Sequence, residues 1–303
     1  VNTVGMVALV SGIAIMTIGV LAAKPILTLM DTPEDVLSEA VTYLRLYFVG
    51  VPFFLIFDFG AAILRSKGDT KRPLYILVVA GIVNTVLNLV FVICFGMGVA
   101  GVAIATGIAN AVSAALIVWL LAKEKEPFRL HIKDIGIYWS ELKRMLLIGV
   151  PAGMQGMVFS FSNVLLQTAI NSHGANAIAG SAAALNFEFY CYFVISAFNG
   201  AAISFIGQNY GAGKLDRVKR IYWICMAMSI LMCGTLNELF VWQHTGFLSL
   251  FSTDPDVQAY GYIRMRTALA FQFIACSYEI SASALRGFGK SMLPTILTVF
   301  GTC

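Results

Sequence analysis

Long runs without a single charged side chain are the feature that most constrains what this chain can fold into. Residues 1–23, 73–122 and 145–187 contain no Asp, Glu, Lys or Arg. Each run exceeds the roughly 20 residues that a helix needs to cross the hydrocarbon core of a bilayer. Hydrophobic residues make up 59% of the chain and charged residues only 12%, which is far from the averages of soluble domains. The sequence therefore predicts a polytopic membrane protein.

We predict that every membrane span is an α-helix, because a chain in lipid must satisfy its own backbone hydrogen bonds. The apolar segments are too long to be the strands of a membrane barrel. Nine predicted spans follow one another along the chain: 3–23, 41–64, 74–95, 99–122, 145–170, 178–206, 220–242, 260–285 and one that starts at 291. The predicted fold class is therefore an all-α polytopic membrane protein.

The chain repeats itself with an offset of 221 positions. Residues 250–294 align with residues 29–73 without a gap, and Gly289 then meets Gly68. Duplication of a whole half is common among transporter folds. The repeat predicts two six-helix lobes that insert the same way up, because each half has an even number of spans. Such lobes are related by an axis along the membrane normal, which is an internal parallel repeat.

The longest polar stretch, residues 123–144, marks the boundary between the two halves. We expect a partial N-terminal lobe at 1–122 with four spans, a cytoplasmic inter-lobe loop, and a C-terminal lobe at 145–303 with about five spans. By the same offset, about 75 residues should precede Val1 and about 40 should follow Cys303. The first lobe would then lack its first two helices, and the second lobe would lack its end.

Basic side chains gather in alternate loops. Most of the 20 Lys and Arg residues lie in the loops 65–72, 123–144, 207–220 and 286–290, whereas an intervening loop carries carboxylates such as Asp254. By the positive-inside rule, the four basic loops face the cytoplasm and the protein lies in the cell (plasma or inner) membrane. Because the charge is spread over short loops, the net charge of +4 predicts no nucleic-acid partner.

The sequence shows no pattern typical of a catalytic or metal centre. The 3 histidines are isolated, and the apolar runs contain no C-x-x-C pair. Cysteines inside these runs are expected to be buried, reduced side chains that act as small hydrophobes. They are Cys94, Cys191, Cys225, Cys233 and Cys276. We therefore expect no enzymatic activity, no cofactor and no resident metal.

Three carboxylates, Asp58, Glu188 and Glu279, lie well inside predicted spans. A charged group at the bilayer centre costs about 2.5–3.5 kcal/mol, so it needs either a partner or a function. Burial raises the proton affinity of a carboxylate, as a proton-coupled carrier requires, and the anion can also hold Na⁺ or a cationic drug. The alternative is that the carboxylate pairs with an arginine, such as Arg264 or Arg266, and locks two helices together.

Polar side chains without charge form a second group of candidates. Five of them lie near the carboxylates or on the span 145–170: Gln155, Asn163, Gln167, Asn186 and Tyr190. Asn163 and Gln167 are four residues apart and so share a helix face, as do Asn84 and Asn88. Such groups either line a cavity or bond to another helix, and for Asn84 and Asn88 we favour a bond to another helix. The aromatic run 187–193 would suit flat aromatic cations, and it would equally serve as packing.

Four motifs resemble those of the multidrug and toxic compound extrusion (MATE) family. They are AILRSKGDTKRP at 62–73, GVAGVAIAT at 98–106, GQNYGAG at 207–213 and SALRGFGK at 283–290. In order and spacing, the chain is similar to helices three to eleven of the twelve in that family. The resemblance implies two lobes around a central cavity and export of cationic or amphipathic drugs, driven by inward flow of H⁺ or Na⁺.

On this resemblance we expect Glu188 to be the coupling residue of the second half, with Glu279 as its partner in the cavity and Na⁺ or H⁺ bound at either. Asp58 marks the depth of Glu279 in the first half. The family also uses carboxylates on its first and seventh helices, but this chain has no acidic residue on its seventh. The expected partners are small cationic or amphipathic molecules, H⁺ or Na⁺ and the lipid bilayer, and we expect a monomer. The alternative function is a flippase for lipid-linked oligosaccharides or another lipid precursor, which occurs in related folds.

Overall fold

Within residues 1–29, 34–131 and 136–302, which the computed structural model describes, the chain forms helices and turns but no strand. Eight helices in this part of the chain are long and apolar enough to cross a membrane. The predicted all-α membrane fold is therefore confirmed. Residues 132–135 of the predicted loop 123–144, and Cys303, lie outside the described residues.

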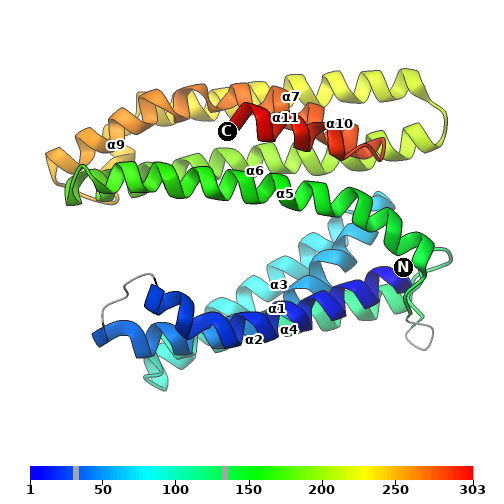
Figure 1. Cartoon of the computed structure of the whole chain (residues 1–303), viewed down its shortest axis with the longest axis horizontal. Helices are drawn as coiled ribbons and strands as arrows, with labels where there is room; N and C mark the ends of the chain where they lie inside the picture. Colours follow the sequence, from blue (N-terminus) through cyan, green and yellow to red (C-terminus); the bar gives the residue numbers. More distant parts are fainter. Residues whose placement is uncertain (30–33, 132–135, 303) are drawn as a thin grey trace. The chain divides into compact units, whose positions relative to one another are not determined.

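The chain divides into two compact units, Val1–Leu142 and Lys143–Cys303. The first unit contains α1 (Asn2–Leu29), α2 (Glu34–Ser66), α3 (Lys71–Leu89) with a π-helical end η1 (Val90–Cys94), and α4 (Gly98–Ala122) (Figure 1). The second contains most of α5 (Trp139–Asn171), then α6 (Ala175–Gly211), α7 (Leu215–Trp242), α8 (His244–Leu248), α9 (Pro255–Thr267), the 3₁₀ segment η3 (Leu269–Ile274), α10 (Ala275–Gly287) and α11 (Met292–Thr302).

In the first unit, α2 packs against both α1 and α4. Small residues allow this close packing, since a Cβ added at Gly50 would lie only 3.1 Å from the Cα of Gly107. Leu64 and Ile117 are fully buried between α2 and α4. Asn84 donates a hydrogen bond of 3.2 Å to the Thr106 hydroxyl, which links α3 to α4. This interhelical bond agrees with the role that we favoured for Asn84.

In the second unit, α6 is the central helix and packs against α7, α9 and α10. Its buried face carries Phe187, Cys191 and Ile195, which meet Cys233 of α7 and Cys276 of α10 in one apolar core. Helix α5 is different, because the only buried residues that it contributes are Pro151 and Gln155. Its remaining length is therefore a wall beside the packed helices rather than part of their core.

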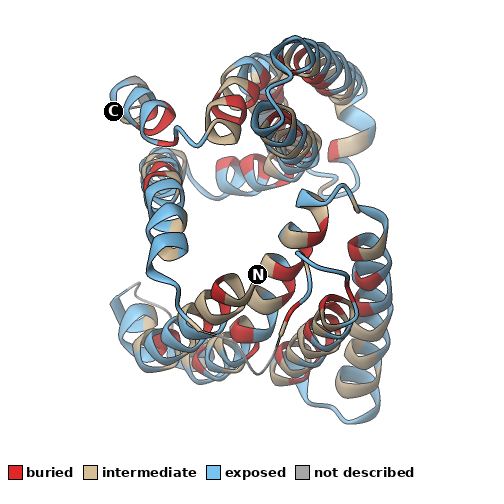
Figure 2. Cartoon of the chain, turned by 90° about the vertical axis from the view of Figure 1, so that its right-hand side faces the viewer, coloured by how far each residue is buried: buried red, intermediate tan, exposed pale blue. Residues whose placement is uncertain are grey.

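Buried residues lie in stripes on the helices, and much of the remaining helix surface is exposed (Figure 2). That exposed surface carries many large apolar side chains, including Ile18, Leu21, Leu74 and Trp223. Burying one such side chain from water is worth about 1.5–3 kcal/mol, so a protein surrounded by water would not leave so many exposed. A lipid environment removes this cost and explains the pattern.

The structure refines one predicted span and corrects the environment of one cysteine. The span predicted at 260–285 corresponds to the candidate membrane span Pro255–Gly287, within which the 3₁₀ segment Leu269–Ile274 separates α9 from α10. Cys94 is exposed rather than buried, because it lies in η1 at the end of its span, whereas the other four cysteines among the described residues are buried and free. The ninth predicted span corresponds to α11, which has 11 residues and is not among the eight long helices.

The helix boundaries agree with the offset of 221 positions. Glu34–Ser66, the bounds of α2, correspond to residues 255–287, which run from the start of α9 to the end of α10. Likewise α3 begins at Lys71 and α11 at Met292. Superposition of the two halves, with their spans running in the same direction, stays a prediction.

Candidate functional site

A cavity of about 630 Å³ lies in the second unit, between the wall helix α5 and the helices α6, α9, η3 and α10. Three charged residues line it: Glu188 of α6, Arg264 of α9 and Glu279 of α10. Four aromatic residues also contribute to the lining: Phe159, Phe189, Tyr192 and Tyr278. The cavity therefore combines apolar aromatic walls with a small number of charges, as sites for small molecules typically do.

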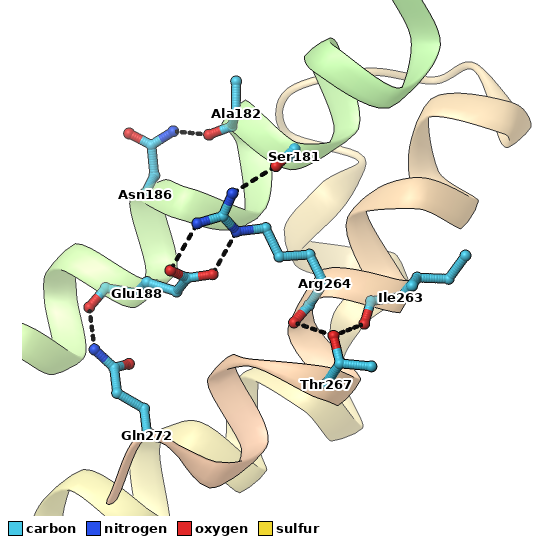
Figure 3. Close-up of polar contacts among 8 residues, drawn as sticks. All are labelled: Ser181, Ala182, Asn186, Glu188, Ile263, Arg264, Thr267 and Gln272. Atoms are coloured by element: carbon cyan, nitrogen blue, oxygen red, sulfur yellow. Dashed lines mark hydrogen bonds and ion pairs between the residues drawn. The ribbon is translucent and has the colours of Figure 1, made fainter. Parts of the chain in front are cut away.

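Glu188 is held in an ion pair across two helices (Figure 3). The Nε and Nη2 atoms of Arg264 donate to the two carboxylate oxygens of Glu188 at 2.6 and 3.0 Å, and Nη1 donates to the Ser181 hydroxyl at 2.6 Å. The side chains of Arg264 and Glu188 are only 15% and 17% exposed. Such a bidentate ion pair between arginine and a carboxylate is among the strongest side-chain contacts. The alternative that we left open for an intramembrane carboxylate, pairing with Arg264, is therefore present for Glu188.

Glu279 has a different environment. Its carboxylate accepts a hydrogen bond of 2.9 Å from the Asn199 side chain of α6. In the described part of the chain, Glu279 forms no ion pair with a Lys, Arg or His side chain. The side-chain oxygen of Asn199 is buried and has no hydrogen-bond partner among the described residues. Glu279 is thus the cavity carboxylate that forms no ion pair among the described residues, and Arg286 acts on it only through space.

Gln155 does not line the cavity, although the sequence made it a candidate. It lies 3% exposed on α5, where Arg286 donates to its side-chain oxygen and its amide nitrogen donates to the Tyr278 hydroxyl. Close by, the hydroxyl of Thr295 on α11 donates to the carbonyl oxygen of Pro151 at 2.8 Å. These bonds fasten one part of α5 to α10 and α11. Gln155 therefore helps to hold the cavity wall in place.

The remaining candidates divide according to helix face. Asn163 and Gln167 both line the cavity, which is one of the two roles that the sequence left open for them. Asn186 and Tyr190 do not line it and are exposed, and the Asn186 amide donates to the carbonyl oxygen of Ala182 on its own helix. On α6 the cavity is lined by residues 185, 188, 189, 192 and 195, which share one helix face, and neither Asn186 nor Tyr190 is among them.

Asp58 lies in the other unit, on α2. It is exposed, and its nearest charged partner is Arg65 of the same helix, at 3.5 Å. The sequence analysis did not single out Gln272 or Tyr278 as cavity residues. A polar glutamine inside an apolar run and a tyrosine next to Glu279 were the signals that could have indicated them.

Almost the whole chain, including the helices that line this cavity, is similar to known proteins. A family model described as MatE matches residues 1–90 and 151–303. The probable multidrug resistance protein YoeA of Bacillus subtilis is 27% identical over 298 residues, which cover 95% of this chain and 64% of YoeA. The probable multidrug resistance protein YpnP of the same organism is 29% identical over 285 residues, which cover 93% of this chain and 63% of YpnP. The chain therefore spans just under two thirds of the length of these relatives.

The fold also matches solved structures. One is the outward-facing conformation of a multidrug resistance MATE family transporter of the MOP superfamily. Its TM-score is 0.91 at 20% sequence identity, with 98% of this chain and 67% of that chain covered. At this identity the likeness shows the fold alone.

Proposed function

Because the chain belongs to the MatE family, we propose that the protein is a secondary active antiporter that exports cationic or amphipathic small molecules in exchange for H⁺ or Na⁺. The two units Val1–Leu142 and Lys143–Cys303 would be its partial N-terminal and C-terminal lobes. The basic loops would face the cytoplasm of the cell membrane, and the transporter would act as a monomer.

The observation that carries this proposal is the position of Glu279 in an aromatic cavity without a basic partner. A carboxylate without an ion-pair partner attracts cations, and aromatic faces such as those of Phe159 and Tyr192 add favourable contacts with them. The same carboxylate can take up a proton or Na⁺ when the substrate leaves. Glu279 would therefore be the group for which substrate and coupling ion compete.

This assignment differs from our prediction that Glu188 is the coupling residue. The guanidinium of Arg264 already balances the charge of Glu188 and occupies both of its oxygens. A cation would have to displace Arg264 before it could bind there, whereas Glu279 presents no such competitor. We therefore assign the exchange of H⁺ or Na⁺ to Glu279, and to the ion pair of Glu188 the role of positioning α9 against α6.

The chemistry of the cavity argues against the flippase alternative. A lipid-linked sugar carries phosphate groups, which proteins bind with several arginine and lysine side chains. The cavity lining contains one basic residue, Arg264, and its donors already bind Glu188 and Ser181. Anionic headgroups would also be repelled by Glu279.

The test is transport by the full-length protein in proteoliposomes with an imposed proton or sodium gradient. We expect Glu279→Gln to reduce gradient-driven ethidium efflux by about tenfold or more, because the variant cannot exchange a proton or hold a cation. Glu279→Asp should retain part of the activity.

Asp58→Asn is the matched control, because Asp58 is an intramembrane carboxylate that lies outside this cavity. It should transport like the wild type. Full gradient-dependent efflux by Glu279→Gln would overturn the assignment. Movement of a labelled lipid-linked sugar, without ethidium efflux, would support the flippase.

A further inference from the structure

We propose that α9, η3 and α10 form one hinged membrane span, and that Glu188 holds the hinge closed through two positioning residues, Arg264 and Gln272. A cationic substrate that competes with Arg264 for the carboxylate would release the hinge. This last step rests on the proposed function, whereas the hinge itself does not.

The break between α9 and α10 is the first observation. Helix α9 ends at Thr267, and the 3₁₀ segment Leu269–Ile274 precedes α10. Sharp irregularities in helices usually have an identifiable cause, such as a proline or a Gly/Ser pair. The segment 268–274 contains no proline, glycine or serine. A mid-helix stretch of 3₁₀ conformation often marks a hinge.

The repeat provides a comparison inside the same chain. The residues that correspond to Leu269–Ile274 by the offset of 221 are 48–53, which lie within the continuous helix α2. That helix stays unbroken even though it contains Pro52. The break is therefore a property of the second half, where the cavity lies.

Glu188 contacts both sides of this break (Figure 3). Its carboxylate binds Arg264, which lies in the last turn of α9, at 2.6 and 3.0 Å. Its backbone carbonyl oxygen accepts a hydrogen bond of 3.1 Å from the side chain of Gln272, which lies in η3. One residue of α6 thus fixes the end of α9 and the 3₁₀ segment at the same time.

The hydrogen bond from Gln272 to Glu188 requires burying the side-chain oxygen of Gln272. This oxygen is buried and has no hydrogen-bond partner in the part of the chain that the structure describes. A buried polar atom without a partner is destabilising. An apolar residue would avoid that cost, so the glutamine is best explained by the bond that its amide donates to Glu188.

Close backbone contacts hold the span on both sides of the break. In the middle of α9, a Cβ added at Gly180 would lie 2.8 Å from the backbone nitrogen of Gly261. Near the end of α10, a Cβ added at Gly287 would lie 3.3 Å from the backbone nitrogen of Gly207. Backbones that approach this closely leave little room for sliding. The proposed movement therefore lies between these two contacts.

The cavity touches both sides of the break, because Arg264, Gln272 and Glu279 all line it. An occupant can shift the hinge only if it binds one state more tightly than the other. A cation meets this condition, since it gains a partner in Glu188 when Arg264 is displaced. The released end of α9 would then be free to move relative to α10.

The experiment measures distances across the break in full-length protein in lipid nanodiscs. Spin labels at Tyr260 and Ile274, both exposed, span the end of α9 and the 3₁₀ segment. The matched pair in the unbroken helix α2 is Glu39 and Phe53, which correspond by the offset of 221 and are also exposed. Cys94 is replaced by Ser to leave no exposed native thiol among the described residues.

We expect a single narrow distance for Tyr260–Ile274 in the wild type, and its loss in Gln272→Leu and in Glu188→Gln. Ethidium should shift the wild type towards the distribution of Glu188→Gln and should leave that variant unchanged. The charge exchange Glu188→Arg with Arg264→Glu should restore the narrow distance. Gln258→Leu is the control, because the Gln258 amide donates to the carbonyl oxygen of Ser252, outside the cavity.

An unchanged narrow distance in Gln272→Leu would overturn the hinge, as would equal broadening in Gln258→Leu or in the α2 pair. Absence of an ethidium shift would overturn the release step alone. Because the distances are recorded without a gradient, they do not depend on transport. If the distances change as expected but Glu279→Gln still shows full efflux, the hinge is supported and the assignment of coupling to Glu279 is wrong.

Discussion

Gly68 and Gly289 lie 221 positions apart and adopt the same left-handed backbone, with φ of 92° and 76°. Each closes the turn that ends a membrane span. After Gly68, the amide of Asp69 donates to the carbonyl oxygen of Leu64 at 3.0 Å. After Gly289, the amide of Lys290 donates to the carbonyl oxygen of Leu285 at 2.9 Å, which is the same bond shifted by the repeat.

Because the two turns have the same backbone conformation, we predict that replacing either glycine by alanine destabilises the protein to the same extent. A Cβ added at either glycine would meet nothing within 4 Å, so only the backbone conformation opposes a side chain. Gly68→Ala and Gly289→Ala should each lower the free energy of unfolding by about 1–2 kcal/mol, as measured by thermal unfolding of the purified protein. Gly81→Ala, inside α3 and equally open, should instead be stabilising by about 0.5–1 kcal/mol. Stabilisation by either turn variant would contradict the prediction.

The orientation of the loops predicts a labelling pattern. Single cysteines at Lys71 and Lys290, both exposed, should react with a membrane-impermeant maleimide only from the cytoplasmic side. Cysteines at Ser38 and Ala259, near the starts of the spans that precede these two positions, should react only from outside. Labelling is done in a background without Cys94, which is the exposed cysteine among the described residues. Reaction of Lys71 and Lys290 positions from opposite sides would contradict the parallel repeat.

Glu124 predicts a dependence of stability on pH. Its side chain is 7% exposed and binds Lys67 and Arg72, so it ties two basic loops together. The hydrogen bond from Lys67 and, to a smaller extent, the one from Arg72 hold the pKa of the Glu124 carboxyl below its ordinary value. A carboxyl whose pKa is lowered by folding stabilises the protein above its unfolded pKa, and this stabilisation is lost as the pH falls through the folded pKa.

Glu124→Gln should therefore lower the free energy of unfolding by about 1–3 kcal/mol at pH 7. The difference from the wild type should shrink below about pH 4.3, where the unfolded carboxyl becomes protonated. Thermal unfolding between pH 7 and pH 3 measures both effects. Glu39→Gln, at an exposed position, is the control and should change little. A difference that stays constant across this range would show that the charge of Glu124 is not the cause.

The contact between α6 and α9 at Gly180 leaves no room for a larger side chain, so we expect a substitution there to be destabilising. A Cβ added there would lie 2.2 Å from the carbonyl oxygen of Val257, a backbone atom that cannot turn aside. Gly180→Ala should push the helices apart at a cost of about 1–3 kcal/mol in thermal unfolding. It should also weaken the neighbouring bond between Ser181 and Arg264. Gly200→Ala, in the same helix with nothing within 4 Å, should be neutral or slightly stabilising, and equal melting temperatures for the two variants would refute the argument.

Most of the fold could be predicted from the sequence because its determinants are local. The length of an uncharged run decides whether a helix can cross a bilayer, and glycines mark the ends of spans. These signals indicated the all-α membrane class and the positions of most spans. The break at Leu269–Ile274 could not be predicted in this way, since the residues of that segment carry no local helix breaker.

The same distinction between local and tertiary determinants applies to the candidate site. Inspection of the sequence identified Glu188 and Glu279 as unusual, because a carboxylate inside an apolar run is a local feature. It did not decide which of them is held in an ion pair. Arg264 lies 76 positions from Glu188 and Asn199 lies 80 positions from Glu279, so only the packing of α6 against α9 and α10 brings these partners together. The sequence determined which groups are costly to bury, and the tertiary structure decided which of them is neutralised.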